Sequence, residues 1–464
     1  MAQHHSPDRP DTIVRKLGRF VAGADHETMS DDAREELRKR ILDTIGVAIG
    51  ALEGEPIRMI REHNADFGGR ELCTFIGGGK GAPDRVAFYN GALSRYLDFM
   101  DSYLARGETC HQSDNFGAVL AAAEYADASG DDLLSAMAVA YQVQGRLCDE
   151  APVRARGFDH TVQGAYASAA GVARALGLDA EKSAMAIAIS GTCNNALRCT
   201  RTGSLSHWKG LAYPQAAFVG AHAAFLAMRG ITGPEAVFEG NKGFMEAIAG
   251  EFSIDWENED LNNVIKSIIK KYNAEIHSQS SIEGALELQQ EHGFTWDQIE
   301  HVGIDIFDVA FHIIGGGEEG DKTIVRTKEE ADHSLQYMVG VALIDGNVLP
   351  AQYEGDRVTR DDIQSLLRRF TVRPKQEYTD RFPAEVCTDL TITLKDGTVL
   401  KKTRTDYEGF NTRPMSWETV EAKFTHLTVP FTSERSRKAI VDAVRNLEQV
   451  SARELAAVLG NLNG

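Results

Sequence analysis

The sequence lacks most motifs that identify metal-dependent and nucleotide-dependent enzymes. Its six cysteines are scattered over 464 residues without a Cys-x-x-Cys pair, so the usual spacing of zinc and iron–sulfur ligands is absent. No Gly-x-Ser-x-Gly motif occurs, no Gly-x-Gly-x-x-Gly follows a strand pattern, and the GGGK at residues 77–80 lacks Walker spacing. We therefore expect chemistry that needs no metal or organic cofactor, and reduced thiols typical of a cytoplasmic protein.

Basic residues and long apolar runs are also scarce. The chain has 49 Lys and Arg against 68 Asp and Glu, and this net charge of −19 argues against a nucleic-acid partner. No apolar run reaches the roughly 20 residues that cross a bilayer, and the N-terminus has no apolar signal segment, so no membrane partner is expected. A small anionic substrate remains compatible with this charge, because a few cations in a cleft outweigh the global field.

What the chain does contain is helical periodicity at both ends. Apolar residues recur at helical spacing over residues 12–23 and 33–50, and Ser30 followed by two aspartates is a typical helix start. Alanine-rich helical patterns fill residues 83–228, and the tail at residues 416–462 returns to the same period. These patterns predict a compact helical bundle with short connections.

Between these helical parts the pattern changes. Apolar and polar residues alternate from Val302 to Ile306, as in a half-buried strand, and residues 385–404 predict a β-hairpin with its turn at Asp396-Gly397. Helical patterns accompany the strands at residues 281–292, 328–343 and 359–370.

The predicted fold is therefore mainly α and has three parts. Both chain ends form a large helical-bundle domain, residues 12–269 and 406–464, into which a smaller α+β lid domain, residues 270–405, is inserted. Residues 1–11 are expected to be a mobile tail. Because ligand clefts favour domain interfaces, polar residues near the junctions are the first functional candidates.

The first candidates lie in LDFMDSY, directly after a helical pattern. Asp98, Asp101 and Ser102 have the spacing of three or four residues that places side chains on one face at a helix end. They could form part of an acid/base site. They could equally be surface residues without a joint role.

Three histidines occupy informative positions near expected helix starts. His111 precedes a helix for which Ser113 or Asp114 is a natural N-cap, and a helix N-terminus favours anions. His160 starts an alanine-rich helix, and His277 lies at the expected domain junction. The alternative for each is an ordinary polar residue at a helix terminus or loop.

Two further groups complete the candidate set. Arg198, Arg201 and Lys209 cluster in one loop between apolar helices, and a buried carboxylate needs such donors. A basic surface loop is the alternative. His333 lies four residues before Tyr337, so the two are expected on one helix face, either as catalytic groups or as a buried hydrogen-bonded couple.

Together and in order, these segments resemble those of the MmgE/PrpD family over nearly the whole chain. The matching pieces are LDFMDSY, CHQSDNFGAVL, GFDHT, ALRCTRTGSLSHWKG, KYNAEIHSQSSIEGA, ADHSLQY and EGFNTRPMSW. The resemblance implies a helical domain, a lid domain, a homodimer, an active site between the domains and activity without a cofactor. By motif match, the functional positions of the family fall on Asp98, Ser102, His111, His160, Lys209, His277 and Tyr337.

The family includes 2-methylcitrate dehydratase and cis-aconitate decarboxylase, and the segments AEIHSQSSIE and SDN favour the dehydratase branch. The implied reaction is a β-elimination from a 2-methylcitrate-like hydroxy-tricarboxylate. A base removes the proton beside a carboxylate and an acid protonates the departing hydroxyl, roles that suit imidazoles near neutral pH. Lys209 with one of the two arginines would hold carboxylates, and Asp98 would orient His111 or His160. Which histidine is acid and which is base stays open.

Three alternatives stay open as well. The protein could be a cis-aconitate-type decarboxylase, a dehydratase or isomerase of another hydroxy acid, or a non-catalytic homologue. Two departures from the family pattern bear on the substrate, because Gln112 and Asn273 stand beside the expected site where the family usually has proline.

Overall fold

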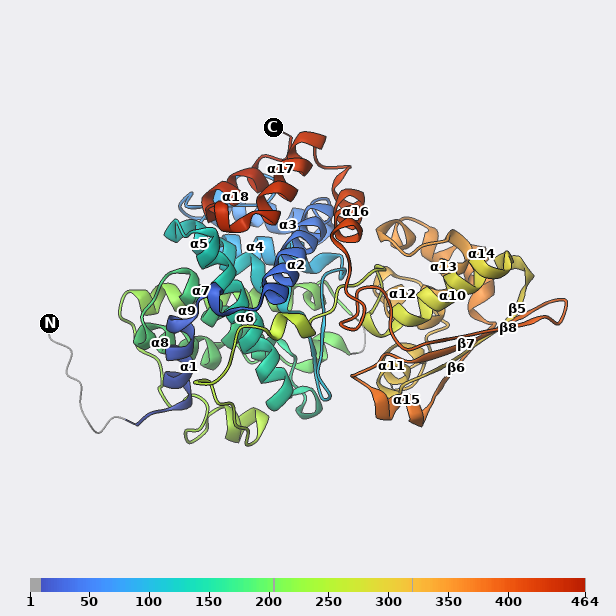
Figure 1. Cartoon of the computed structure of the whole chain (residues 1–464), viewed down its shortest axis with the longest axis horizontal. Coiled ribbons are helices and arrows are strands. Elements are labelled where there is room, and N and C mark those ends of the chain that lie inside the picture. Colours follow the sequence, from blue (N-terminus) through green and yellow to red (C-terminus); the bar gives the residue numbers. More distant parts are fainter. Residues whose placement is uncertain (1–9, 203–204, 319, 464) are drawn as a thin grey trace.

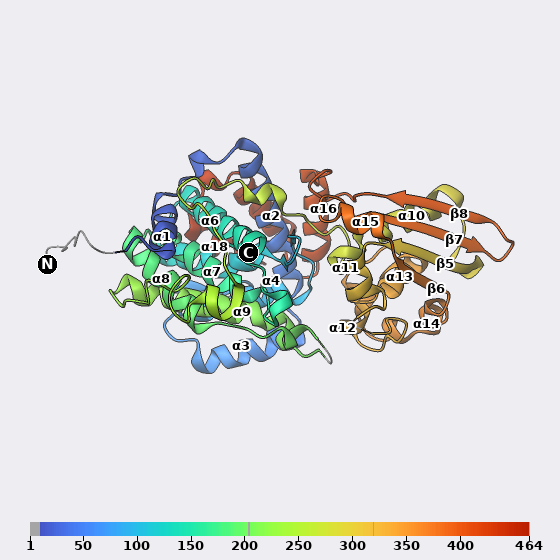
Figure 2. The same cartoon turned by 90° about the horizontal axis from the view of Figure 1, so that it is seen from below.

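The computed structural model describes residues 10–202, 205–318 and 320–463 and shows a mainly α protein with two lobes (Figure 1). The larger lobe is helical and contains both ends of the described chain, whereas the smaller lobe combines helices with a four-stranded sheet. The same two lobes are separate in the view from below (Figure 2). Residues 1–9 of the expected tail lie outside the described residues.

Helices of the larger lobe follow the periodicity of the sequence. Its N-terminal part contains α1 (Ile13–Gly23), α2 (Asp31–Gly50), α3 (Glu55–Phe67), α4 (Pro83–Tyr96), α5 (Phe116–Ala126), α6 (Gly130–Glu150), α7 (Thr161–Ala175), α8 (Ala180–Cys193) and α9 (Trp208–Met228). The predicted start of α2 is confirmed, because the Ser30 hydroxyl accepts a hydrogen bond from the backbone N–H of Ala33. The end of α2 at Gly50 also agrees with the prediction.

Small residues let these helices approach closely. A Cβ at Gly117 of α5 would lie only 2.5 Å from the backbone nitrogen of Gly91 in α4. A Cβ at Gly220 of α9 would lie 2.9 Å from the backbone nitrogen of Ala169 in α7. Larger side chains at these glycines would therefore force the helices apart.

The C-terminal helices return to the larger lobe. α16 (Trp417–Thr428), α17 (Glu434–Arg445) and α18 (Ala452–Gly460) lie beside the N-terminal helices, as the red and blue ribbons of Figure 1 show. Phe424 of α16 lies 3.1 Å from the position that a Cβ at Gly46 of α2 would take. One hydrophobic core therefore joins both chain ends.

The sequence led us to expect no apolar segment long enough to cross a membrane. The helix α9 contradicts this expectation in its length and composition. Among the described helices it alone has the necessary length and composition. However, it packs against α4, α7 and α8, and more than half of its apolar window is buried. The apolar residues of α9 therefore contribute to the protein core.

The smaller lobe is built on a sheet with the strand order β6-β5-β7-β8. β5 (Ile299–Ile306) pairs antiparallel with β7 (Thr388–Leu394), which forms the predicted hairpin with β8 (Val399–Arg404). β6 (Phe370–Pro374) pairs parallel with β5 and was not predicted. Only its first residue is buried, so this edge strand lacks the alternation that reveals a strand.

The helices of the smaller lobe share a second hydrophobic core with this sheet. They are α10 (Gln279–His292), α11 (Asp308–Ala310), α12 (Lys328–Ala331), α13 (Leu335–Asp345), α14 (Asp361–Leu367) and α15 (Gln376–Arg381). The helix expected over residues 328–343 is thus two helices. The break occurs because the Ser334 hydroxyl caps a new helix by accepting the N–H of Tyr337.

A buried lysine of α16 joins distant parts of the chain. Lys423 Nζ lies 2.7 Å from the Asp43 carboxylate of α2 and donates to the backbone carbonyls of Phe99 at 2.7 Å and Lys270 at 2.9 Å. Burial lowers the pKa of Lys423 and raises that of Asp43, so each charge depends on its partner.

Lys423→Met is expected to lower the free energy of unfolding by about 3–5 kcal/mol, because the Asp43 carboxylate would stay buried without a partner. Chemical denaturation measures this loss. The double variant Asp43→Leu/Lys423→Met removes both charges and should recover much of it, so an equal loss in both variants would argue against the pairing. As a control, Lys182→Met disrupts an exposed pair with Asp179 and should cost less than about 1 kcal/mol.

Candidate active site

A cavity of about 1370 Å³ is lined by residues from both lobes. It brings together most of the predicted site residues, which come from separate segments of the chain. Those that line it are Asp98, His111, His160, Arg198, Arg201, Lys209 and His277. A volume of this size accommodates a small polycarboxylate.

The segment after α4 does not continue as a helix, which corrects the expected shared face of Asp98, Asp101 and Ser102. α4 ends at Tyr96, and Asp98 adopts φ 53°, a left-handed conformation that is uncommon for a residue other than glycine. Asp98 therefore lines the cavity, whereas the carboxylate of Asp101 is buried and accepts a hydrogen bond from the Tyr141 hydroxyl at 2.7 Å.

Three cations surround the carboxylate of Asp98. Its Oδ1 lies 2.6 Å from Arg95 Nη1 and 3.0 Å from Lys270 Nζ, and its Oδ2 lies 3.5 Å from Lys209 Nζ. Lys270 also donates to the backbone carbonyl of Asp98 at 2.6 Å. Burial alone would raise the pKa of Asp98, but the three cations hold it well below its usual value.

His111 precedes the 3-10 turn Gln112–Asn115 that leads into α5, as predicted. Its Nδ1 lies 2.7 Å from the backbone carbonyl of Asp101, which can only accept, so Nδ1 carries the proton and Nε2 is an acceptor. The hydroxyl of Ser102 lies 3.2 Å from the same nitrogen. Burial and nearby cations lower the pKa of His111 well below 6.5, so the imidazole is neutral at pH 7.

His160 occupies the N-cap position of α7, and its ring centroid lies 5.6 Å from that of His111. Arg201 Nη2 lies 3.1 Å from His160 Nε2. A guanidinium only donates, so Nε2 accepts and Nδ1 carries the proton. Nδ1 is buried and has no hydrogen-bond partner among the described residues. Burial lowers the pKa of His160 to about 3.

Arg201 is already bound within the protein. Its Nε lies 2.6 Å from the Asp159 carboxylate, and its Nη1 donates to the backbone carbonyl of Lys209 at 3.3 Å. The expected role of Asp98 in orienting a histidine is thus taken by other groups, with Arg201 acting on His160.

His277 lies in the 3-10 turn Ile276–Ser278 before α10. Its Nδ1 is 2.7 Å from Glu275 Oε1, so the carboxylate orients the ring and Nε2 is left as a buried acceptor without a partner among the described residues. Phe307 and Phe382 pack against the ring. Burial alone would raise the pKa of Glu275, but His277 lowers it to about 2, so Glu275 is charged at pH 7.

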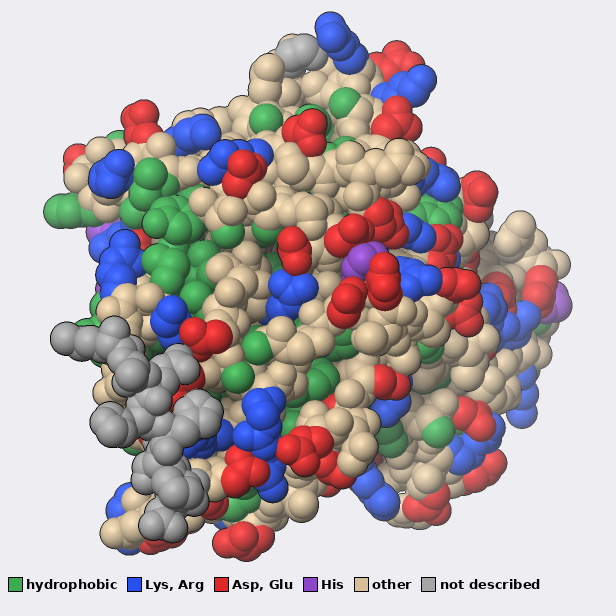
Figure 3. Space-filling view, turned by 60° about the vertical axis from the view of Figure 1, so that its left-hand side comes forward, with side chains coloured by type: hydrophobic (Ala, Val, Ile, Leu, Met, Phe, Trp, Pro, Cys, Tyr) green, Lys and Arg blue, Asp and Glu red, His purple; other side chains and the backbone are tan. Residues whose placement is uncertain are grey.

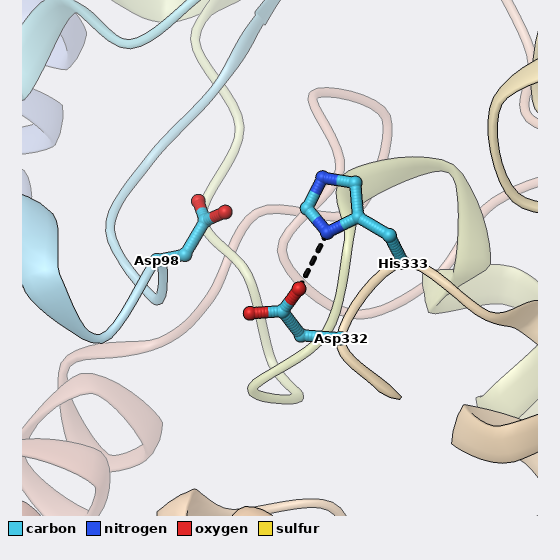
Figure 4. A group of neighbouring side chains, drawn as sticks. All are labelled: Asp98, Asp332 and His333. Carbon is cyan, nitrogen blue, oxygen red and sulfur yellow. Dashed lines mark hydrogen bonds and ion pairs between the residues drawn. The ribbon is translucent and has the colours of Figure 1, made fainter. Parts of the chain in front are cut away.

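Lys209 bridges the two lobes. Its Nζ lies 3.5 Å from both the Asp98 and the Asp332 carboxylates and 3.2 Å from His333 Nδ1. Figure 4 shows Asp332 and His333 in contact and Asp98 approaching them from a separate segment. Burial lowers the pKa of Lys209, although both carboxylates oppose the shift.

This cluster also resembles a metal site. Single ligand atoms of Asp98, Asp332 and His333 lie within 4.8 Å of one another. However, Lys209 contacts both carboxylates, and Lys328 Nζ lies 2.9 Å from Asp332. The negative charges are already balanced by ammonium groups, which favours an ion-pair network over a cation site.

Two predicted site residues are not among the residues that line the cavity. Tyr337 is fully buried in the smaller lobe and donates its hydroxyl to the backbone carbonyl of Gln352. It does not share a helix with His333, which precedes α13. Ser102 is also fully buried and reaches the cavity only through its contact with His111.

The helix cap differs from the sequence prediction, and three further charged residues that line the cavity were not predicted. The N-cap position of α5 is Asn115, whereas Asp114 is buried and its pKa is raised by burial to about 7. The three further residues are Arg95, Lys270 and Glu275. Arg95 and Glu275 lie within three residues of the predicted site residues Asp98 and His277. This closeness in sequence is the feature that could have identified them.

Comparison with known families accounts for nearly the whole chain. The model of the MmgE/PrpD N-terminal domain matches residues 15–257, and that of the MmgE/PrpD C-terminal domain matches residues 272–449. The chain belongs to the MmgE/PrpD family. The resemblance found in its motifs is confirmed.

Relatives in this family are similar along most of their length. A 2-methylcitrate dehydratase of Salmonella typhi is 30% identical over 402 residues, 80% of each chain, and one of Cupriavidus necator is 29% identical over 436 residues, 86% of each chain. The cis-aconitate decarboxylase of Mus musculus is 24% identical over 465 residues, covering 95% of this chain and 91% of its own.

The two departures from the family pattern are not among the residues that line the cavity. Gln112 is fully buried and donates to the backbone carbonyl of Tyr141 at 2.6 Å and to Asn263 Oδ1 at 2.7 Å. Asn273 donates to the backbone carbonyl of Leu97 at 2.7 Å. Gln112 therefore binds a backbone carbonyl and a side chain of the helical lobe, and Asn273 binds a backbone carbonyl next to Asp98.

Asp98→Asn tests the ion-pair cluster. Because the folded-state pKa of Asp98 is lowered, its carboxylate adds stability above the ordinary pKa near 4 and loses this contribution as the pH falls through the folded-state value. The wild-type protein should be more stable than the variant by about 3 kcal/mol at pH 7, and this difference should shrink toward pH 2.

Urea denaturation of both proteins between pH 7 and pH 2 measures this dependence. Asp305→Asn removes a carboxylate from an exposed ion pair with Arg373 and serves as a control that should show little change at any pH. A difference for Asp98→Asn that does not vary with pH would contradict the assignment.

Proposed function

We propose that this protein is a hydro-lyase that removes water from a 2-methylcitrate-like hydroxy-tricarboxylate without a metal or organic cofactor. The names of several relatives support this reaction. The observation that carries it is the Glu275–His277 pair. It places an imidazole nitrogen, which has no partner in the described part of the chain, in a cavity wall that also contains Lys209 and Lys270.

His277 is the general base in this proposal. The Glu275 carboxylate accepts the Nδ1–H, which fixes the tautomer and leaves Nε2 as the acceptor. Nε2 takes the proton from the carbon beside a substrate carboxylate. His111 is less suited to this step, because its Nδ1–H is bound by a neutral carbonyl and burial lowers its pKa.

A lysine and a neutral imidazole stabilise the charge that develops on the substrate carboxylate. Lys270 and the Nδ1–H of His160 donate to its oxygens while the electron pair of the broken C–H bond moves into the carboxylate. That electron pair then forms the C=C double bond as the C–O bond to the β-hydroxyl breaks. Lys209 binds this hydroxyl and donates the proton that releases it as water, a role favoured by its lowered pKa.

Decarboxylation of cis-aconitate is the second candidate, supported by the similarity to the mouse enzyme. The same residues could bind its carboxylates while carbon is protonated and CO₂ leaves. Dehydration is preferred because the relatives named 2-methylcitrate dehydratase are more similar to this chain, at 27–30% identity against 24% for the decarboxylase. A non-catalytic homologue is disfavoured because the polar groups are present in the cavity wall. Gln112 and Asn273 give no reason to prefer a different hydroxy acid, since neither lines the cavity.

Product analysis tests the reaction directly. Purified protein pretreated with EDTA is expected to convert 2-methylcitrate to a methylaconitate and water, which nuclear magnetic resonance and mass spectrometry would detect. Release of CO₂ and a dicarboxylate from cis-aconitate would overturn the dehydratase assignment. Loss of activity after chelation would contradict the cofactor-free reaction.

Glu275→Gln is expected to lower kcat by about 10²-fold or more, because the amide cannot support the charge on protonated His277. Steady-state kinetics should show little change in KM. Glu329→Gln, which alters another carboxylate of the cavity wall, is the matched control and should leave kcat nearly unchanged. Equal effects of the two substitutions would remove the case for a specific Glu–His pair.

We also propose that residues 270–405 form a lid over the cavity and that the protein is cytoplasmic. A hydrophobic core extending from Ile268 to Phe410 supports the lid as a folding unit. The cysteines are free thiols, which suits a reducing compartment.

A homodimer is the proposed assembly. Figure 3 shows hydrophobic side chains gathered on one face of the helical lobe, and exposed hydrophobic residues of this lobe include Met59, Phe67 and Ile231. Burial against a second copy would remove such surface from water. Sedimentation at micromolar concentration should give twice the mass of one chain, and a monomer would contradict this proposal.

A further inference from the structure

Two arginines in the helical wall of the cavity are not held by the protein. Arg154 lies in the 3-10 turn Arg154–Arg156 and Arg198 in the 3-10 turn Arg198–Arg201, and both line the cavity. Among the residues that the structure describes, neither guanidinium has a hydrogen-bond or ion-pair partner. The cations around Asp98, in contrast, are all paired.

Backbone contacts hold the two turns next to each other. The N–H of Arg198 donates to the carbonyl of Gly157 at 2.9 Å, and Phe158 forms an antiparallel bridge with Leu197. Gly157 and Phe158 directly follow the turn that contains Arg154. The contacts therefore bind the end of that turn to the start of the turn that contains Arg198. The two guanidiniums therefore project from one connected backbone platform into the same cavity.

The two carboxylates that act on Arg198 are used elsewhere. Asp159 pairs with Arg201 at 2.6 Å. Glu108 accepts backbone N–H groups of Val153 at 3.2 Å and Arg154 at 3.0 Å, so its carboxylate anchors the turn and does not pair with the guanidinium. Burial raises the pKa of Glu108, while burial and the charge of Arg154 lower that of Arg198. The two arginines repel each other, which an added anion would relieve.

We propose that Arg154 and Arg198 form a carboxylate subsite for the end of the substrate remote from the reacting carbon, which selects tricarboxylates over dicarboxylates. This inference rests on the proposed function, which places the reacting end at Lys209, Lys270 and His277. Guanidinium groups suit the role, because each offers parallel donors that match the two oxygens of a carboxylate.

Binding of two unreactive probes tests the subsite by isothermal titration calorimetry. Tricarballylate has three carboxylates and no hydroxyl to eliminate, and succinate lacks one carboxymethyl arm. Wild-type protein should bind tricarballylate more tightly than succinate. Arg154→Gln and Arg198→Gln should each weaken tricarballylate binding about tenfold, with much smaller effects on succinate.

Arg156→Gln is the matched control, because Arg156 belongs to the same turn as Arg154 but is not among the residues lining the cavity. Its Nη2 lies 2.5 Å from the position that a Cβ at Gly250 would take, on a different segment. Tricarballylate binding should be unchanged in this variant, and thermal unfolding should confirm that all three variants are folded. Equal weakening by Arg156→Gln would overturn the subsite, as would unchanged binding in the other two variants.

The calorimetric result does not depend on turnover. If tricarballylate binding depends on Arg154 and Arg198 but 2-methylcitrate is not dehydrated, the subsite stands and the proposed function fails. If 2-methylcitrate is dehydrated but wild-type protein does not prefer tricarballylate to succinate, the function stands and the subsite is overturned.

Discussion

The carboxylate of Asp98 makes the cationic cavity possible. Arg95, Lys209 and Lys270 approach it from three segments, and without a negative charge at this point their mutual repulsion would oppose the fold. The backbone of Asp98 is held in the left-handed region, and Lys270 contacts both its carbonyl and its carboxylate. One residue thus concentrates positive charge where an anionic substrate is proposed to bind.

Support for this arrangement comes from the far end of the chain. Lys423, from a C-terminal helix, donates to the backbone carbonyls of Phe99 and Lys270, which belong to the segments that position Asp98 and its ion pair. Its own charge is balanced by Asp43 of α2. The return of the C-terminal segment to the helical lobe therefore stabilises the cavity wall as well as the hydrophobic core.

Three histidines that line the cavity differ in which ring nitrogen the protein binds and in the group that binds it. A carbonyl holds the Nδ1–H of His111 and a carboxylate holds that of His277, so both present Nε2 as an acceptor. Arg201 instead occupies Nε2 of His160, which leaves Nδ1–H as a donor. The three imidazoles are thus chemically distinct, and the carboxylate partner favours His277 as the base in the proposed reaction.

Local patterns in the sequence were sufficient for the helix at Ser30, the β7–β8 hairpin and seven of the side chains that line the cavity, because periodicity, capping and motifs depend on neighbouring residues. They could not show that the chain turns at Asp98, that Tyr337 is directed into a core, or that Arg201 binds Asp159. The direction of a side chain, its ion pairs and its tautomer depend on atoms supplied by distant segments. Only tertiary packing brings those atoms together, so it alone decided which polar residues share the cavity.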